Sequence, residues 1–205
     1  MDAIVLASAS PRRKDLLARM GFRLVVRAAD IDEAFPPGRR DFGRLCGDLA
    51  RRKVRAVLGQ PGLKGYRWFL GADTVVVKGR DVIGKPKDRG EARGFLARLQ
   101  GATHKVVTGL CLHDRQGGGF RLASETSLVR FAKMSGEEID WYLDTGEWEG
   151  VAGAYRIQGK GACFIQHIKG NYTNVMGLPL RLVYGILREI GYPLGIKSSG
   201  PGGPP

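Results

Sequence analysis

The strongest constraint on the fold lies near the N-terminus, where five apolar residues (3–7) are followed by a turn of small residues (8–10) and then by Pro11. The apolar run suits a buried strand. Ser10 is a good N-cap, and Pro11 suits the first helical position because its missing N–H would be unpaired there anyway. The sequence therefore predicts a strand, a tight turn and a helix that begins at Pro11.

Two arginines, Arg12 and Arg13, fall in the first turn of this expected helix. Free backbone N–H groups and the helix dipole make the potential positive there, so two guanidinium groups are mildly unfavourable unless an anion lies nearby. Backbone N–H groups and arginine both suit phosphate oxygens, so the turn that contains Ser8 and the helix start together would make a phosphate cradle. A solvated arginine pair has the same pattern, and this segment alone does not decide between the two.

The charge of the chain favours anionic partners without choosing among them. Lys and Arg number 33 against 20 Asp and Glu, a formal net charge of +13, which attracts nucleic acids, acidic surfaces and polyphosphates alike. The sequence contains no helix-turn-helix, zinc-finger or RNP-like motif, and its basic residues are spread along the chain. We therefore do not expect direct nucleic-acid binding to be the main function.

Length and composition predict a globular protein, because 205 residues with 43% hydrophobic content can bury a sizeable core. No apolar stretch approaches the roughly 20 residues that span a bilayer, and the first apolar run is too short for a signal peptide. Cys46, Cys111 and Cys163 are too widely spaced for a disulfide framework or a zinc ribbon. We expect no membrane partner and a reducing, cytoplasmic setting.

Apolar periodicity predicts strands and helices along most of the chain. The expected strands are residues 22–26, 67–72, 75–77, 81–83, 104–112, 120–131 and 162–168. The expected later helices are about 41–58 and 88–99, one that a capping box opens at Ser135, and 179–190. Residues 28–40 are expected to form a long loop with an acidic start, and the Gly/Pro/Ser-rich residues 193–205 a disordered tail.

Four further side chains are candidates for chemistry. Lys53 lies on the apolar stripe of the second helix, so its ammonium points inward, although snorkelling at a helix end gives the same pattern. Asp73 follows the strand at 67–72, at a position where α/β sheets hold ligands, so it is a candidate base or metal ligand, or else a cap of the next turn. For Glu33, in the acidic loop, three roles stay open: it binds a metal, it pairs with a cation, or it is solvated. Lys85 lies in a turn fixed by its glycine and proline neighbours.

Other catalytic arrangements find little support. The three histidines lack the close spacing of a metal site, and no serine or cysteine lies in a recognisable nucleophile motif. Covalent catalysis is therefore not our first expectation.

Five segments in this order resemble the Maf family of nucleoside triphosphate pyrophosphatases, over roughly residues 3–190. They are Leu6-Ala7-Ser8-Ala9-Ser10-Pro11-Arg12-Arg13, Gly71-Ala72-Asp73-Thr74, Gly84-Lys85-Pro86, Ala152-Gly153-Ala154-Tyr155 with Ile157-Gln158-Gly159, and Val175-Met176-Gly177-Leu178-Pro179. Each piece is weak alone, but the ordered set is very specific. The resemblance implies a Maf/ITPase-like α/β fold, in which a mixed twisted sheet flanked by helices forms one domain, residues 1–192, of two lobes with a central cleft.

The resemblance also implies an activity, hydrolysis of a nucleoside triphosphate to the monophosphate and pyrophosphate, with a divalent metal cation (Mg²⁺ or Mn²⁺) and frequent homodimers. Arg12, Thr74 and Gln158 match the specificity residues of the dTTP/UTP pyrophosphatase branch, and Asp73 matches the proton acceptor. By similarity, Glu33, Lys53 and Lys85 also line the active site. The expected phosphate ligands are Ser8, Arg13, Lys53 and Lys85, and the expected metal ligands are Glu33 and Asp73.

Two departures from the branch lie in one loop. Gly150-Val151 stands where Asp-Lys is usual before Ala-Gly-Ala-Tyr, and Arg156 replaces a usual glycine. One cation is lost and another gained nearby, so we expect Arg156 to substitute in part for the missing lysine. The alternative reading of the whole chain is a non-catalytic regulatory or nucleic-acid-binding protein linked to septum formation and cell division, for which the net charge is the best support.

Overall fold

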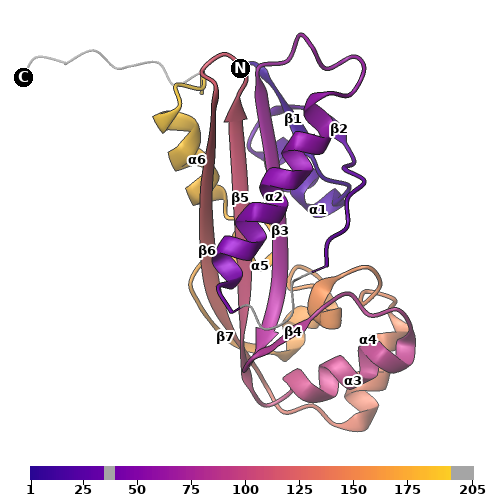
Figure 1. Cartoon of the computed structure of the whole chain (residues 1–205). Helices are drawn as coiled ribbons and strands as arrows, with labels where there is room; N and C mark the ends of the chain where they lie inside the picture. The colour runs from indigo at the N-terminus through magenta and orange to yellow at the C-terminus, as the bar shows by residue number, and fades with distance from the viewer. Residues whose placement is uncertain (35–39, 195–205) are drawn as a thin grey trace, which may run out of the picture.

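The computed structural model describes residues 1–34 and 40–194 and is built on one seven-stranded sheet (Figure 1). The strands are β1 (Ala3–Ala7), β2 (Arg23–Arg27), β3 (Trp68–Lys78), β4 (Asp81–Ile83), β5 (Thr103–Asp114), β6 (Gly119–Phe131) and β7 (Ile165–Lys169). Their order is β2-β1-β3-β5-β6-β7, with β4 paired to β3. β1 is parallel to β2 and β3, and all other pairs are antiparallel. The mixed α/β sheet that we predicted is confirmed.

Helices cover both faces of the sheet (Figure 1). They are α1 (Pro11–Arg19), α2 (Phe42–Leu58), α3 (Arg89–Leu99), α4 (Gly136–Asp144), α5 (Tyr172–Val175) and α6 (Leu180–Glu189), with the 3₁₀ turns η1 (Ala152–Ala154) and η2 (Lys160–Phe164). Side chains alternate along β1, so that Ile4 and Leu6 pack in one cluster with α1 and α6, while Val5 and Ala7 pack with α2. A strand buried on both faces explains why residues 3–7 are continuously apolar.

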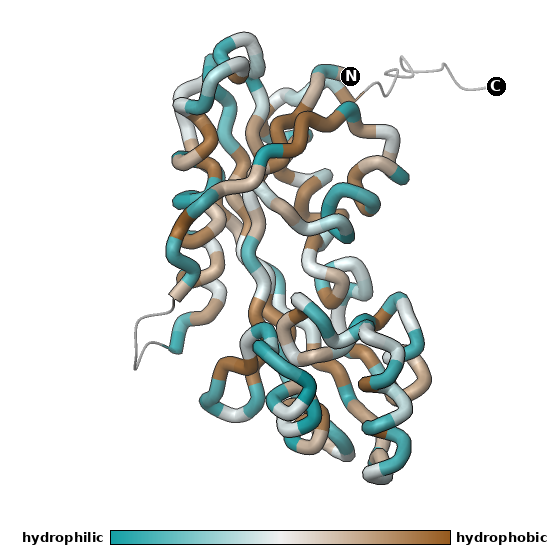
Figure 2. The backbone as a smooth tube through the Cα atoms, turned by 90° about the vertical axis from the view of Figure 1, so that its right-hand side faces the viewer, coloured by the Kyte–Doolittle hydropathy of each residue, from teal (hydrophilic) through white to brown (hydrophobic). Residues whose placement is uncertain are grey.

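A second lobe forms around the far half of β3. Val76 and Ile83 pack there with apolar side chains of α3, α4 and residues 152–164. The strands β3, β5 and β6 have 11, 12 and 13 residues, and in Figure 1 they run from the upper to the lower part of the molecule. Figure 2 shows these two parts of the backbone from the side. The two lobes that we predicted therefore share the same long strands.

The prediction that a strand ends before Asp73 was wrong, because β3 continues through Asp73 and Thr74 to Lys78. Polar residues inside a buried strand are tolerated when partners satisfy them. Here Lys53 binds the Asp73 carboxylate and Arg13 binds the Thr74 hydroxyl. The short hairpin predicted for 75–83 is the antiparallel β3–β4 pair.

The other expected elements are confirmed with small shifts, and one is corrected. Residues 160–164 form η2 in place of the predicted start of a strand at 162, because the Glu147 carboxylate accepts the backbone N–H of Lys160 at 3.0 Å and holds the helical turn. The capping box at Ser135 is present. Within residues 1–34 and 40–194, no helix is long and apolar enough to cross a membrane.

Two predictions fall partly on residues outside the described range. Part of the loop expected at 28–40 (residues 35–39) and most of the tail expected at 193–205 (residues 195–205) lie outside the described residues. The domain boundary at residue 192 stays a prediction.

Candidate active site

A cavity of about 450 Å³ lies where the two lobes meet. One wall comes from β1, the start of α1, α2 and β3, and the other from residues 149–158 of the second lobe. The residues predicted for the site all line this cavity: Ser8, Arg12, Arg13, Glu33, Lys53, Asp73, Thr74, Lys85 and Gln158. The structure therefore brings together residues that lie up to 150 positions apart in the chain, although their individual roles stay predictions.

The most buried charges of the cavity are Asp73 and Lys53, which are only 6% and 5% exposed. The Lys53 ammonium lies 2.6 Å from Oδ1 of Asp73 and 2.7 Å from Oε1 of Glu33. One cation thus holds two carboxylates at the edge of the cavity, which compensates the cost of burying these charges. The prediction that Lys53 points inward is confirmed, and the snorkelling alternative does not apply.

Glycines let α2 approach the sheet closely enough for this contact. A Cβ atom on Gly109 would overlap backbone atoms of Cys46 and Gly47, and one on Gly71 would overlap the backbone of Ala50. Gly109 also pairs with Asp73 in the β3–β5 register. Because α2 lies directly on the strands at these points, Lys53 reaches Asp73 one helical turn later.

Glu33 is exposed over 43% of its side chain, and its second carboxylate oxygen lies 3.7 Å from the Lys85 ammonium. Partial burial alone would raise the pKa of Glu33, but the hydrogen bond and charge of Lys53, with the charges of Lys85 and Arg13, hold it below its usual range. Glu33 is therefore ionised at neutral pH. Lys85 is 61% exposed, so its ammonium is accessible to a ligand in the cavity.

Arg13 is buried and donates most of its N–H groups to the protein itself. Its guanidinium donates to the carbonyls of Gly177 and Ala72, both at 2.8 Å, and to the hydroxyls of Ser8 at 3.1 Å and Thr74 at 2.9 Å. An arginine has five N–H donors, so one is left without a partner in the described part of the chain. Arg13 therefore connects the turn after β1, strand β3 and the segment before α6 through hydrogen bonds.

Thr74 continues this connection across the sheet. Its hydroxyl lies 2.9 Å from that of Thr108 on β5, and Thr108 donates to the carbonyl of Asn174 at 3.3 Å. The Asn174 amide in turn donates to Ser127 on β6 at 3.0 Å. Sequence analysis missed this polar chain through the sheet, because Thr108 reads as one more residue of the strand predicted at 104–112 and Asn174 lies in no predicted element.

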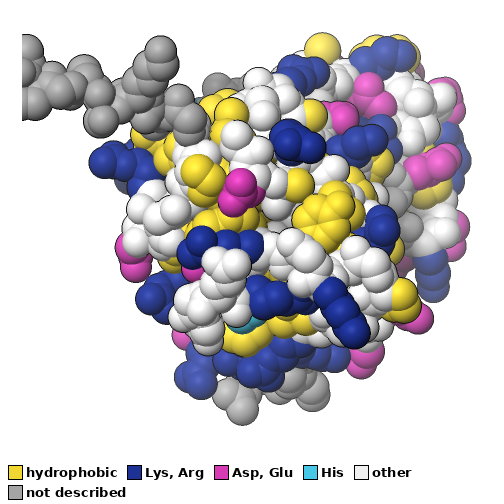
Figure 3. Space-filling model, turned by 90° about the horizontal axis from the view of Figure 1, so that it is seen from above, with side chains coloured by type: hydrophobic (Ala, Val, Ile, Leu, Met, Phe, Trp, Pro, Cys, Tyr) yellow, Lys and Arg dark blue, Asp and Glu magenta, His cyan; other side chains and the backbone are white. Residues whose placement is uncertain are grey.

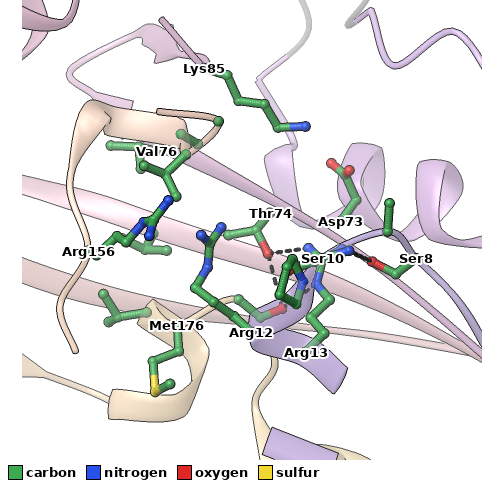
Figure 4. A pocket seen from close by; sticks show the side chains of 18 of the residues that line it. Ser8, Ser10, Arg12, Arg13, Asp73, Thr74, Val76, Lys85, Arg156 and Met176 are labelled. Carbon is green, nitrogen blue, oxygen red and sulfur yellow. Dashed lines mark hydrogen bonds between the residues drawn. The ribbon is translucent and has the colours of Figure 1, made fainter. Parts of the chain in front are cut away.

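Arg12 differs from its neighbour because its guanidinium makes no hydrogen bond within residues 1–34 and 40–194, whereas that of Arg13 makes four. Neither arginine forms an ion pair within those residues. Burial, and then the positive charges of Arg156 and Arg13, lower the pKa of Arg12 to about 10. Figure 4 shows the Arg12 and Arg156 guanidinium groups on one side of Thr74 and the Asp73 carboxylate on the other. The cavity therefore has a paired acidic end and an unpaired basic end.

A divalent cation would find two carboxylates here. Glu33 and Asp73 both line the cavity, and Mg²⁺ commonly takes one or two protein carboxylates and completes its shell with substrate phosphates and water. No cluster of three or more His, Cys, Asp or Glu side chains suited to a metal occurs in the part of the chain that the structure describes. The residues thus fit a metal that the substrate helps to hold, and do not form a complete protein cage.

Comparison with known proteins places these residues in context. The family model described as "Maf-like protein" matches residues 3–190. A dTTP/UTP pyrophosphatase of Anaeromyxobacter dehalogenans (strain 2CP-C) is 45% identical over 195 residues, which cover 93% of this chain and 95% of that protein. A dTTP/UTP pyrophosphatase of Pelotomaculum thermopropionicum is 44% identical over 192 residues, covering 94% and 98%.

A solved structure shows the same fold without close sequence similarity. The Ham1 protein of Staphylococcus aureus aligns over 92% of this chain and 100% of its own, with a TM-score of 0.51 and 12% identity. At this identity the likeness extends to the fold alone, and it agrees with the fold that the sequence motifs implied.

Proposed function

Because the chain belongs to the Maf family, we propose that it is a nucleoside triphosphate pyrophosphatase that hydrolyses dTTP and UTP to the monophosphate and pyrophosphate. The observation that carries this proposal is the buried Asp73–Lys53 pair at the wall of a cavity lined by cations. Phosphoryl transfer leaves a protein mainly with positioning and charge stabilisation, and these side chains supply both. The relatives named above act on the same two nucleotides by their names.

In this proposal Asp73 orients a water molecule and takes its proton as the water attacks the α-phosphorus. Lys53 keeps the Asp73 carboxylate in place, since its ammonium touches Oδ1 and leaves Oδ2 for the water. Lys85, Arg12 and the free N–H of Arg13 bind phosphate oxygens from the open side of the cavity. The attack needs no covalent intermediate.

Nucleoside triphosphate pyrophosphatases generally use divalent metals, and we propose Mg²⁺ or Mn²⁺ here. Such a cation neutralises phosphate charge and makes the α-phosphorus easier to attack. Glu33 and Asp73 would hold it, because their carboxylates face the cavity and Glu33 is ionised well below neutral pH. Lys53, bound to both, fixes their orientation.

Gln158 is the residue proposed to recognise the base. Its exposed side chain lines the cavity from the second lobe, and an amide offers both a donor and an acceptor to the edge of uracil or thymine. Thr74, proposed with Arg12 as a further specificity residue, has its hydroxyl bound to Arg13 and Thr108. We infer that Thr74 acts on specificity through the position of its neighbours.

The wider setting is also proposed from the family. We place the reaction in the cytoplasm, where nucleotide pools lie, and expect a homodimer, which gel filtration can test. The alternative of a nucleic-acid-binding regulator is not favoured by the relatives. Figure 3 shows Lys and Arg side chains at one end of the molecule interspersed with acidic and polar ones, which is unlike the continuous basic face of a nucleic-acid-binding domain.

The test is pyrophosphate release with Mg²⁺ or Mn²⁺ from dTTP, UTP, CTP, 7-methyl-GTP and dATP. We expect dTTP and UTP to lead, and Asp73→Asn to lower turnover at least about a hundredfold, as loss of a general base does. The control is Asp15→Asn, which removes the same charge from the exposed face of α1. Undiminished turnover in Asp73→Asn with a normal melting temperature would refute the role of Asp73, and no release from any nucleotide would refute the activity.

A further inference from the structure

The basic end of the cavity contains two guanidinium groups that come from different lobes. Arg12 lies in the first turn of α1, and Arg156 lies between η1 and η2. Both side chains line the cavity and are partly buried. No ion pair to either one is found among the described residues.

Arg156 is held firmly on its side of the cavity. Its backbone N–H donates to the buried Tyr142 hydroxyl at 3.0 Å, and its Nη2 donates to the carbonyl of Glu149 at 3.1 Å. Its Nε is buried and has no hydrogen-bond partner in the described part of the protein. A fixed guanidinium with an unsatisfied donor is costly unless a ligand supplies an acceptor.

Arg12 is held on the opposite side by the helix that Pro11 begins. The helix dipole and the neighbouring Arg13 add positive potential at this point. The charges of Arg12 and Arg156 repel each other across the cavity, and an anion that accepts hydrogen bonds from both would remove this cost. Three acidic residues line the cavity. Asp73 and Glu33 are bound to lysines, and Glu149 accepts from Arg156 through its backbone carbonyl, with no ion pair between its carboxylate and either arginine among the described residues.

We propose that Arg12 and Arg156 form a clamp across the two lobes for the terminal phosphates of the substrate, the part that leaves as pyrophosphate. This inference rests on the proposed function only in that it names the ligand as part of a triphosphate. The paired Asp73–Lys53 end then faces the α-phosphorus, and the unpaired basic end takes the remaining charge. Arg156 is thereby a binding residue of this chain in a loop that otherwise contacts the base through Gln158.

The test measures binding of inorganic tripolyphosphate and of uridine to the metal-free protein by calorimetry. We expect Arg156→Gln to weaken tripolyphosphate binding about tenfold to a hundredfold, as loss of a hydrogen-bonded charge does, and to leave uridine binding unchanged. Arg156→Lys keeps the charge without the fork and should fall between. Lys160→Gln is the matched control, because it removes one positive charge from an exposed position four residues away.

The outcomes separate this inference from the proposed function. Equal tripolyphosphate affinity in Arg156→Gln and Lys160→Gln would overturn the clamp, even if the protein hydrolyses dTTP. A selective loss of uridine binding would also overturn it, since Arg156 would then bind the nucleoside. Tripolyphosphate binding that depends on Arg156 in a protein without pyrophosphatase activity would support the clamp and refute the proposed reaction.

Discussion

Arg13 and Arg12 are neighbours in the chain, yet the structure predicts opposite consequences for their loss. In Arg13→Met, the carbonyls of Ala72 and Gly177 and the hydroxyls of Ser8 and Thr74 lose their donor. Hydrogen bonds to charged groups contribute about 1.5–3 kcal/mol each, so four independent ones would contribute about 6–12 kcal/mol. Water from the cavity can replace some of these hydrogen bonds, so we expect a smaller loss, about 3–5 kcal/mol.

Arg12→Met is the matched control, because the same substitution one residue earlier removes no side-chain hydrogen bond within the described residues and relieves repulsion from Arg13 and Arg156. We expect a change in the free energy of unfolding below about 1 kcal/mol. Urea unfolding followed by circular dichroism measures both variants. In melting temperature, the loss for Arg13→Met corresponds to about 6–20 °C for a domain of this size.

The result that would refute this reasoning is an equal loss in the two variants. Arg13 would then contribute no more to the folded state than a half-exposed arginine, and its four hydrogen bonds would be exchanged for water at no cost. A large loss confined to Arg13→Met would establish that this arginine mainly builds the site.

Two further predictions concern residues behind the cavity. Burial, and then the charge of Lys78, lower the pKa of His104 from 6.5 to about 4, so below pH 6.5 the unfolded chain binds a proton that the folded chain does not bind. The free energy of unfolding should therefore fall by about 3 kcal/mol between neutral pH and pH 4. Urea titrations at several pH values should show that His104→Phe removes this part of the pH dependence, and an unchanged dependence would contradict the prediction. Gly109→Ala should push α2 away from the sheet, lower the free energy of unfolding by about 1–3 kcal/mol and lower turnover by separating Lys53 from Asp73. The control Gly94→Ala, where a Cβ atom on α3 would meet open space, should have none of these effects. Equal melting temperatures of the two variants would contradict the close approach of α2 at Gly109.

Much of the fold could be predicted because its signals are local. The start of α1 at Pro11, the helix starts near residues 41 and 88 and the capping box at Ser135 each depend on a few neighbouring residues. The inward direction of Lys53 followed from helical periodicity. The site residues came from family motifs, and the structure gathers them in one cavity.

The rest could not be predicted because it depends on partners distant in the chain. Asp73 was expected at the end of a strand, because a carboxylate interrupts an apolar run. Lys53, 20 positions earlier, binds this carboxylate and so allows it to be buried inside the strand. Arg13 was expected to bind phosphate, and nothing local indicates that Gly177, 164 positions later, takes its Nε–H. A glycine inside a β-branched run does indicate a close backbone approach. The close contact at Gly109 could therefore be predicted from the sequence, but its partner, helix α2, could not.

The acidic and basic side chains of the cavity differ in how far they are paired, and this difference determines the orientation of a bound triphosphate. The acidic end is internally neutralised, because Lys53 contacts both Asp73 and Glu33. The basic end has no such ion pairs among the described residues. Burial, and then the positive charges of Arg156 and Arg13, lower the pKa of Arg12. A triphosphate carries its highest charge at the end far from the nucleoside, so it gains most when that end meets the unpaired arginines. When the triphosphate is held in this orientation, its α-phosphorus lies toward Asp73. Among the described residues that line the cavity, Asp73 is the only carboxylate that is both buried and hydrogen-bonded to a lysine. Hydrolysis to pyrophosphate requires this arrangement.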